Sequence, residues 1–165
     1  MLSIEEFKNR MLKKWSIRNF RWKIETANEE QKHWQVVLHD VDHNDNIFFL
    51  TIATSQITKK KAYIQSRSLP HATLVIVPIG ESRYFSLETA FNCNDPIQYG
   101  VAQIYAEYIA DSSIYKWVME VSVLNRIMEA IRISPQISKR IKDKIFTTTQ
   151  LRLLLSNAVV IKNKV

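Results

Sequence analysis

The chain has 165 residues, 46% hydrophobic and 24% charged, a composition that suits one domain with a hydrophobic core and is unlike that of a disordered protein. Its net charge of +7 is concentrated in the second half, where residues 101–165 carry 10 basic and 5 acidic side chains, and this surplus makes a polyanion a candidate partner. Cys93 is the only cysteine, which excludes an internal disulfide and a thiolate zinc cluster.

No apolar run approaches the ~18 residues that span a bilayer. The first ten residues carry acids where a signal peptide has a basic region followed by an apolar one. The lack of paired cysteines suits a reducing compartment. We therefore expect a cytoplasmic protein that does not enter a membrane.

The first predicted element is a short amphipathic helix within residues 1–17. Ser3 can cap it, acids lie in its first turn, and lysines lie near its end, an order of charges that suits the helix dipole. This helix is expected to pack on the part of the chain that follows. Its apolar residues recur at helical spacing and are Ile4, Phe7, Met11 and Trp15.

From residue 18 to residue 112 the sequence predicts a β region. Short segments rich in β-branched and aromatic residues alternate with polar, turn-like stretches. The mostly short connections favour a small, strongly bent antiparallel sheet or barrel over alternating βαβ units. Only two glycines occur in the chain, so a glycine-rich phosphate-binding loop is absent. The five expected strands are NFRWKIE, HWQVVLHDV, NIFFLTIAT, ATLVIVPI and RYFSLETAFNC, and VAQIYAEYI is a sixth candidate.

Residues 113–165 are predicted to be helical. Ser122 can cap one helix, and Ser134 with Pro135 can start another, which carries a basic cluster. The leucine-rich segment from residue 147 onward is expected to add a short helix docked on the body or on a second subunit. The fold class is therefore α+β in a single domain of residues 1–165, with an N-terminal helix, a sheet or barrel and C-terminal helices.

The stretch FFLTIATSQITKKK, residues 48–61, raises the question of function. An apolar strand stops at Thr54, Ser55 and Gln56, which offer two hydroxyls and an amide to a ligand, and a polar loop with three lysines follows. In one reading the lysines are a solvated turn that blocks edge aggregation. In the other, hydroxyls and positive charge meet the phosphates of RNA or DNA, Arg67 adds a bidentate contact and Tyr63 stacks on a base. The lysines are Lys59, Lys60 and Lys61.

The segment HDVDHNDN, residues 39–46, also has two readings. It gathers two histidines and three aspartates, which resembles a metal site. A calcium loop in this register needs Gly at its sixth position and Glu at its twelfth, where the chain has Asp45 and Thr51. Asn, Asp and His are also preferred in hairpin turns. We therefore interpret the segment as a turn, and we expect no metal and no cofactor.

The order of segments resembles the PemK/MazF-like toxins, the endoribonucleases of bacterial toxin–antitoxin modules. The similar features are a strand ending in IATSQ, a long polar loop, then PHATLVIVP and ETAFNCNDPI, over roughly residues 32–138. Thr54 and Ser55 match the family's Thr-Ser pair, and Asn92, Cys93 and Asn94 stand at the place of its Arg-Cys-Asp triplet. The resemblance implies an SH3-like barrel, a homodimer, metal-free cleavage of single-stranded RNA and an antitoxin protein as a partner.

The chain departs from the family pattern at its reactive groups. His33 and Trp34 stand where the family has an Arg-Pro step, and amides replace the triplet's Arg and Asp. An amide supplies neither general acid–base chemistry at neutral pH nor a guanidinium charge, and loss of one such donor typically costs ~3 kcal/mol in barrier height. Either His33 and Arg67 have taken over these tasks, or the barrel binds without cutting.

The first functional hypothesis is a toxin-like endoribonuclease. In it His33 transfers the proton, Thr54 and Ser55 face the phosphate, and Asn92 and Asn94 are orienting amides. The RNA-binding residues are Tyr63, which stacks on a base, and the backbone contacts Lys59, Lys60, Lys61 and Arg67. The alternatives are a non-catalytic barrel that binds nucleic acid or a protein partner, and a phage-type assembly protein whose C-terminal helices make subunit contacts.

Overall fold

The structure is a computed structural model that describes residues 2–12, 16–23, 30–39, 41, 45–110 and 117–146. For residues 11, 16–23, 30–33, 117 and 118 it describes the backbone. The helices are α1 (Ile4–Met11), α2 (Ile57–Ser66), α3 (Val101–Ala110), α4 (Val121–Ile133) and α5 (Lys139–Ile145), with a 3-10 turn at His71–Thr73. The strands are β1 (Ser16–Lys23), β2 (Glu30–Val37), β3 (Ile47–Thr54), β4 (Leu74–Val77), β5 (Thr89–Asn92), β6 (Ile97–Gly100) and β7 (Trp117–Val118).

The strand β3 lies at the centre of an antiparallel sheet. One edge of β3 pairs with β2, and its other edge pairs with β6 along its first half and with β5 at its end. The order across the sheet is β4-β5-β3-β2-β1-β7, with β6 beside β3. Within the described residues β4 and β7 remain as edges, so the sheet is open. The predicted α+β fold with an antiparallel sheet is confirmed, and its alternative, a closed SH3-like barrel, is wrong.

A large bulge separates β5 from β6. Phe91 lies opposite Ala53 and Ile97 lies opposite Leu50, so residues 51 and 52 of β3 face the longer stretch 92–96. A bulge bends the strand that contains it and disrupts the local ladder. This bulge carries Cys93 and Asn94, which are 1% and 3% exposed.

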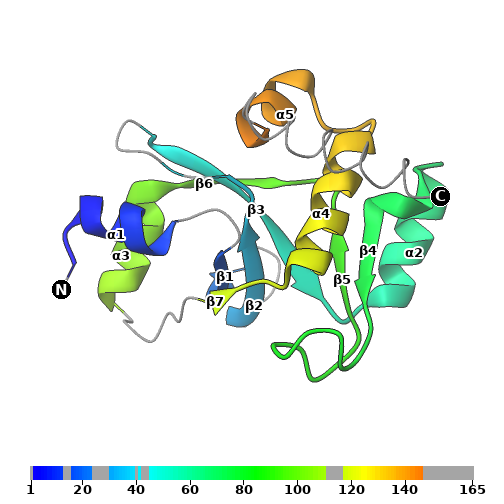
Figure 1. The fold of residues 1–165 in the computed structure, drawn as a ribbon, viewed down its shortest axis with the longest axis horizontal. Helices are drawn as coiled ribbons and strands as arrows, with labels where there is room; N and C mark the ends of the chain where they lie inside the picture. The colour runs from blue at the N-terminus through cyan, green and yellow to red at the C-terminus, as the bar shows by residue number, and fades with distance from the viewer. Residues whose placement is uncertain are drawn as a thin grey trace, which may run out of the picture.

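Alternation along the strands divides the apolar core into two main parts. On one face of β3, Phe49 and Ala53 belong to a core that includes Ile127 and Ile131 of α4. On the other face, Phe48 and Leu50 join Phe7 of α1 and Ile104 of α3 in a second core. Figure 1 shows α1 and α3 together at one end of the molecule and α2 beside β4 at the other. Burial of a side chain of this size stabilises the fold by about 1.5–3 kcal/mol.

Two segments that we expected to be loop or strand are helical. Residues 57–66, expected within a polar loop, form α2 because Ile57 and Ile64 share one face and are buried against β4 and β5. VAQIYAEYI, expected as a strand, forms most of α3, in which Val101 and Ile104 are buried at a spacing of three rather than two. The first part of RYFSLETAFNC is not a strand, because β5 begins at Thr89.

The predicted cap of the first helix is confirmed, while the starts of the last two helices differ from prediction. Ser3 caps α1 in a full capping box with Glu6, and the helix ends at Met11. The N-cap of α4 is Glu120 rather than Ser122. Ser138 caps α5 by accepting from Ile141 N. Residues 134 and 135 do not start that helix, because the residue after Ile133 is the C-cap of α4.

The helix expected from residue 147 onward lies outside the described residues. In the ranges that the structure describes, no helix has the length and apolar character needed to cross a membrane.

Candidate functional site

The polar end of β3 opens into a pocket of about 300 Å³, which we call the strand-end pocket. Thr54, Ser55 and Gln56 line it from the end of β3, so two hydroxyls and one amide stand at the same opening. Ala53 of β3 also lines the pocket, and β2, β5 and the loop before β5 supply the rest of the lining. These remaining residues are Trp34, Tyr84, Phe85, Ser86, Leu87 and Thr89.

Local hydrogen bonds fix the turn at the end of β3. Thr54 Oγ1 accepts from Gln56 N at 3.1 Å, and Ile57 N donates to Ser55 O at 2.9 Å. These bonds stop the strand and start α2 within three residues. The bond to Thr54 uses a lone pair of the hydroxyl oxygen, so its proton is free to be donated to a ligand.

Aromatic side chains form the apolar wall of the strand-end pocket. The Trp34 ring meets Phe85 edge-on at 6.2 Å between centroids and lies 6.4 Å from Tyr84. Phe85 packs in turn on the buried Phe91 at 5.9 Å, which anchors the wall to the core. Arg83 Nε donates to Tyr84 Oη at 2.9 Å and holds the phenol in place. Aromatic rings beside hydroxyl and amide groups suit a flat polar ligand such as a nucleobase.

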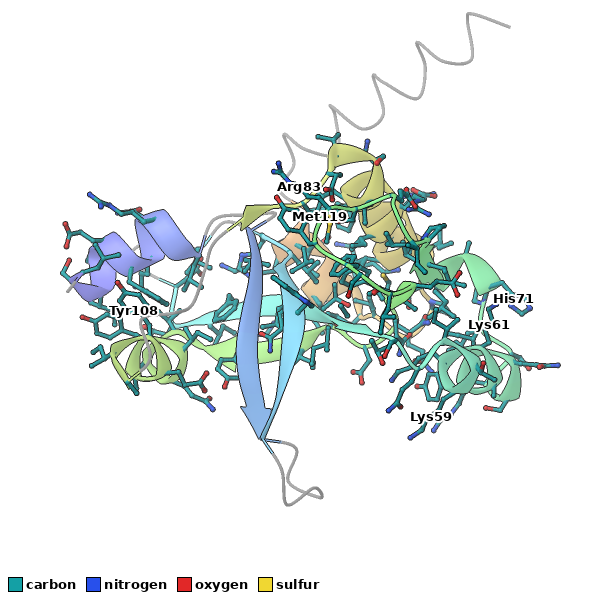
Figure 2. The ribbon with its side chains drawn as sticks, turned by 90° about the horizontal axis from the view of Figure 1, so that it is seen from below. Lys59, Lys61, His71, Arg83, Tyr108 and Met119 are labelled. Atoms are coloured by element: carbon teal, nitrogen blue, oxygen red, sulfur yellow. The ribbon has the colours of Figure 1, made fainter. Side chains whose placement is uncertain are left out.

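The helix α2, which begins next to the strand-end pocket, carries three consecutive lysines spread around its surface. Lys59 and Lys61 are exposed, and Figure 2 shows them around α2 with His71 nearby. The Arg67 guanidinium lies 5.5 Å from the Tyr63 ring centroid. No carboxylate occurs in the sequence between residues 46 and 80. Among the described residues, the three lysines of α2 and Arg67 take part in no ion pair.

The N-terminus of α2 adds to this positive potential. Gln56 is the N-cap residue, and its side chain makes no capping hydrogen bond. The first backbone N–H groups of a helix carry a partial positive charge that favours an anion. Because Gln56 also lines the strand-end pocket, this end of α2 lies at the pocket's edge. Lys59 follows three residues later, about 5 Å along the helix axis.

The structure separates Asn92 and Asn94 from the strand-end pocket. Asn94 is buried, and its amide donates to Thr73 Oγ1 at 2.7 Å and to Asn92 Oδ1 at 3.1 Å. Its Oδ1 accepts from Ser134 Oγ at 2.7 Å. These bonds use the amide inside the protein, and neither asparagine is among the pocket's lining residues. Asn94 is a packing residue here, which differs from the expected orienting role at a substrate.

His33 lies in β2, where its backbone is opposite Phe20. Its neighbour Trp34 lines the strand-end pocket, while the His33 side chain lies outside the described part of the structure. Of the expected site residues, Thr54 and Ser55 therefore lie together in the pocket, and the three lysines, Tyr63 and Arg67 lie on or directly after α2.

The histidine- and aspartate-rich segment is only partly described. His39 is buried, and its Nε2 accepts from Phe49 N at 3.2 Å, which is a structural hydrogen bond between neighbouring strands. Asp45 forms an ion pair with Lys144. Residues 40 and 42–44 lie outside the described ranges. Across the residues that are described, no group of three His, Cys, Asp or Glu side chains could hold a metal ion.

The strand-end pocket is better equipped for binding than for proton transfer. None of its described lining residues carries an imidazole, a carboxylate or a guanidinium. The only thiol in the chain is also unreactive, because burial raises the pKa of Cys93 to about 12. The described groups can donate and accept hydrogen bonds and offer aromatic surface.

Sequence reasoning missed the aromatic wall. Trp34 and Tyr84 are 50 positions apart, and no local pattern joins them. One available signal was the YF pair in a segment bounded by polar residues, because Tyr combines a large apolar ring with a polar hydroxyl that suits binding surfaces.

No protein-family model matches the chain, and no curated protein matches it significantly.

Proposed function

We propose that this protein binds single-stranded RNA, with one base in the strand-end pocket and the phosphate backbone along α2. The observation that carries the proposal is the contact between these two surfaces at Gln56, which both caps α2 and lines the pocket. A base needs a flat apolar surface and hydrogen-bond partners, and the phosphates that flank it need cations within a few ångströms.

Trp34 and Tyr84 supply aromatic surface, and stacking of this kind contributes about 1–3 kcal/mol per base. Thr54, Ser55 and Gln56 supply donors and acceptors for the base edge. The lysines of α2 have no carboxylate partner among the described residues, so they keep their charge for phosphates. A duplex would not expose a base to so small a pocket, which favours a single strand.

Cleavage of the bound RNA is a second candidate function. It is favoured by the position of Thr54 and Ser55, the pair on which the toxin resemblance depends, at the opening of the pocket beside α2. It requires a general acid or base that the described lining lacks, so His33 is the residue to test. The homodimer and the antitoxin partner implied by the same resemblance stay predictions.

The binding test is fluorescence anisotropy of a labelled single-stranded RNA at about 50 mM and about 200 mM salt. We expect binding that weakens with salt by a slope of about 0.7 per phosphate contact. The double variant Lys59→Glu with Lys61→Glu should abolish most of the binding. Its matched control is Lys139→Glu with Arg140→Glu, which reverses two exposed charges on α5 and should leave much of the binding intact. If the two double variants lose RNA affinity equally, the loss reflects the net charge of the protein, and an RNA site on α2 is refuted.

The pocket is tested by Gln56→Ala and Thr54→Val, which should weaken binding with an unchanged salt slope because they remove contacts to a base. Cleavage is followed with the same RNA on a denaturing gel. Fragments from the wild-type protein that disappear with His33→Ala would support the endoribonuclease. If the RNA stays intact at saturating protein, the protein binds RNA without nuclease activity.

A further inference from the structure

A second pocket lies between the end of α4 and α5, and we call it the α4–α5 pocket. Its volume is about 350 Å³. It shares no described lining residue with the strand-end pocket, so it is independent of the proposed RNA site. Its lining residues are Arg132, Ile137, Lys139, Lys142, Asp143 and Phe146.

The α4–α5 pocket has an apolar floor. Ile137 and Phe146 are 5% and 4% exposed, and both belong to the core that α4 closes. The polar lining residues are exposed or half-buried, so no buried polar group is directed into the pocket. A site for a small polar molecule normally contains such groups, because they fix the orientation of the ligand. This floor instead suits an apolar side chain that needs only shape and water exclusion.

The rim of the α4–α5 pocket is cationic. Its lining contains three basic side chains and one acidic side chain, a net charge of +2. Lys139 pairs with Asp143 at 2.7 Å, and Arg132 pairs with Glu129, but these pairs are exposed. Exposed pairs contribute about 0–1 kcal/mol each, so a ligand carboxylate can displace them at little cost.

We propose that the α4–α5 pocket docks an acidic segment of a partner protein. The segment inserts one leucine- or phenylalanine-sized side chain over Ile137 and Phe146 and places flanking carboxylates beside Lys139 and Arg132. Charge complementarity selects an acidic partner, and the apolar floor selects a polypeptide over a nucleic acid. The lining contains a single aromatic ring, so it offers no series of stacking surfaces for successive bases of a nucleic acid.

The test uses a synthetic fluorescent peptide with a central Phe-Leu pair flanked by glutamates, titrated against the full chain. Two comparison peptides replace Phe-Leu by Ala-Ala or every Glu by Gln. We expect each change to weaken binding by about tenfold, because one removes the apolar anchor and the other removes the charge attraction. Backbone amide shifts in an NMR titration should be confined to residues 129–146.

The variant Lys139→Glu should weaken the binding of the acidic peptide by about fivefold, because the Lys139 side chain lies at the rim of the pocket. The matched control is Arg140→Glu on the same helix, an exposed residue outside the lining, which should change affinity by less than about twofold. Both positions are on the surface, so the fold is kept.

Three outcomes overturn the proposal. The first is an Ala-Ala peptide that binds as tightly as the original peptide, because the affinity would then come from charge attraction without an apolar anchor. The second is equal weakening by Lys139→Glu and Arg140→Glu. The third is a set of amide shifts outside residues 129–146, or shifts within them produced by single-stranded RNA, which would place this surface in a nucleic-acid site.

Discussion

Ser134 Oγ donates a hydrogen bond to Asn94 Oδ1 at 2.7 Å and so joins the end of α4 to the bulge between β5 and β6. The same Asn94 amide donates to Thr73 Oγ1 at 2.7 Å in the 3-10 turn before β4. All three side chains are buried. One side chain therefore ties together three segments that are distant in the sequence.

Replacing Asn94 by Ala should lower the free energy of unfolding by about 1–3 kcal/mol, because it leaves buried hydroxyls of Ser134 and Thr73 without their partner. Urea unfolding measures the loss. The control is Asn92→Ala, which should cost less because Asn92 is only half-buried. RNA binding per folded molecule should not change. If Asn94→Ala has normal stability but loses RNA binding or cleavage, Asn94 acts in the functional site and not in packing.

The ammonium of Lys142 donates to Arg132 O at 2.8 Å and to Ser134 O at 2.7 Å, and so caps the C-terminus of α4. Changing Lys142 to Met keeps most of the aliphatic stem and removes the charge. We expect a loss of about 1 kcal/mol in the free energy of unfolding, since both the hydrogen bonds and the interaction with the helix dipole disappear. Lys139→Met should have a smaller effect because its side chain is 89% exposed. Thermal unfolding of the two variants in parallel measures the two losses of stability. Equal losses would argue against a capping role of Lys142.

The capping box of α1 should make its stability depend on pH. Ser3 N and Ser3 Oγ donate to Glu6 Oε2 at 2.9 and 3.0 Å, and these bonds, the backbone one first, lower the pKa of Glu6 below its ordinary value of 4.5. A carboxyl whose pKa is lower in the folded state stabilises the fold above the unfolded pKa, and this contribution is lost as pH falls through the folded pKa.

The variant Glu6→Gln should therefore be less stable than wild type at neutral pH, and the difference in stability should shrink as the pH falls below 4.5 and through the folded pKa. Chemical denaturation at a series of pH values checks the trend. Glu88→Gln is the control, because Glu88 is exposed and forms no ion pair among the described residues, whereas Glu5 pairs with Lys8 at 3.4 Å. A difference between Glu6→Gln and wild type that is constant with pH would contradict the ionic capping box.

Cys93 should react with a thiol reagent only after unfolding. It is 1% exposed, burial raises its pKa to about 12, and its Sγ donates to Phe91 O at 3.6 Å. The thiolate is the reactive form, so at mildly alkaline pH the native thiol is both shielded and protonated. The reaction rate with a chromogenic disulfide, measured with and without denaturant, should rise by orders of magnitude on unfolding. Rapid labelling of the native protein would show that the bulge opens.

Local patterns predicted elements that depend on neighbouring residues. Ser3 and Glu6 predict the start of α1, and the apolar run of residues 47–54 predicts β3, because capping and alternation act within a few residues. The same approach misread α2 and α3. In α2 the run of lysines made the segment look like a polar loop. The spacing of Ile57 and Ile64 indicates a helix only once it is known that the sheet covers one face of this segment.

Residue order and composition are enough to predict the strand that ends in two hydroxyls, the basic run after it, the α+β class and the excess of positive charge. Three features could not be predicted in this way: the sheet is open, Trp34 and Tyr84 meet beside Thr54, and the amide of Asn94 is hydrogen-bonded to Ser134 and Thr73. Contacts between distant segments depend on strand order and on a bulge in the partner of β3, and short-range propensity does not encode either of them.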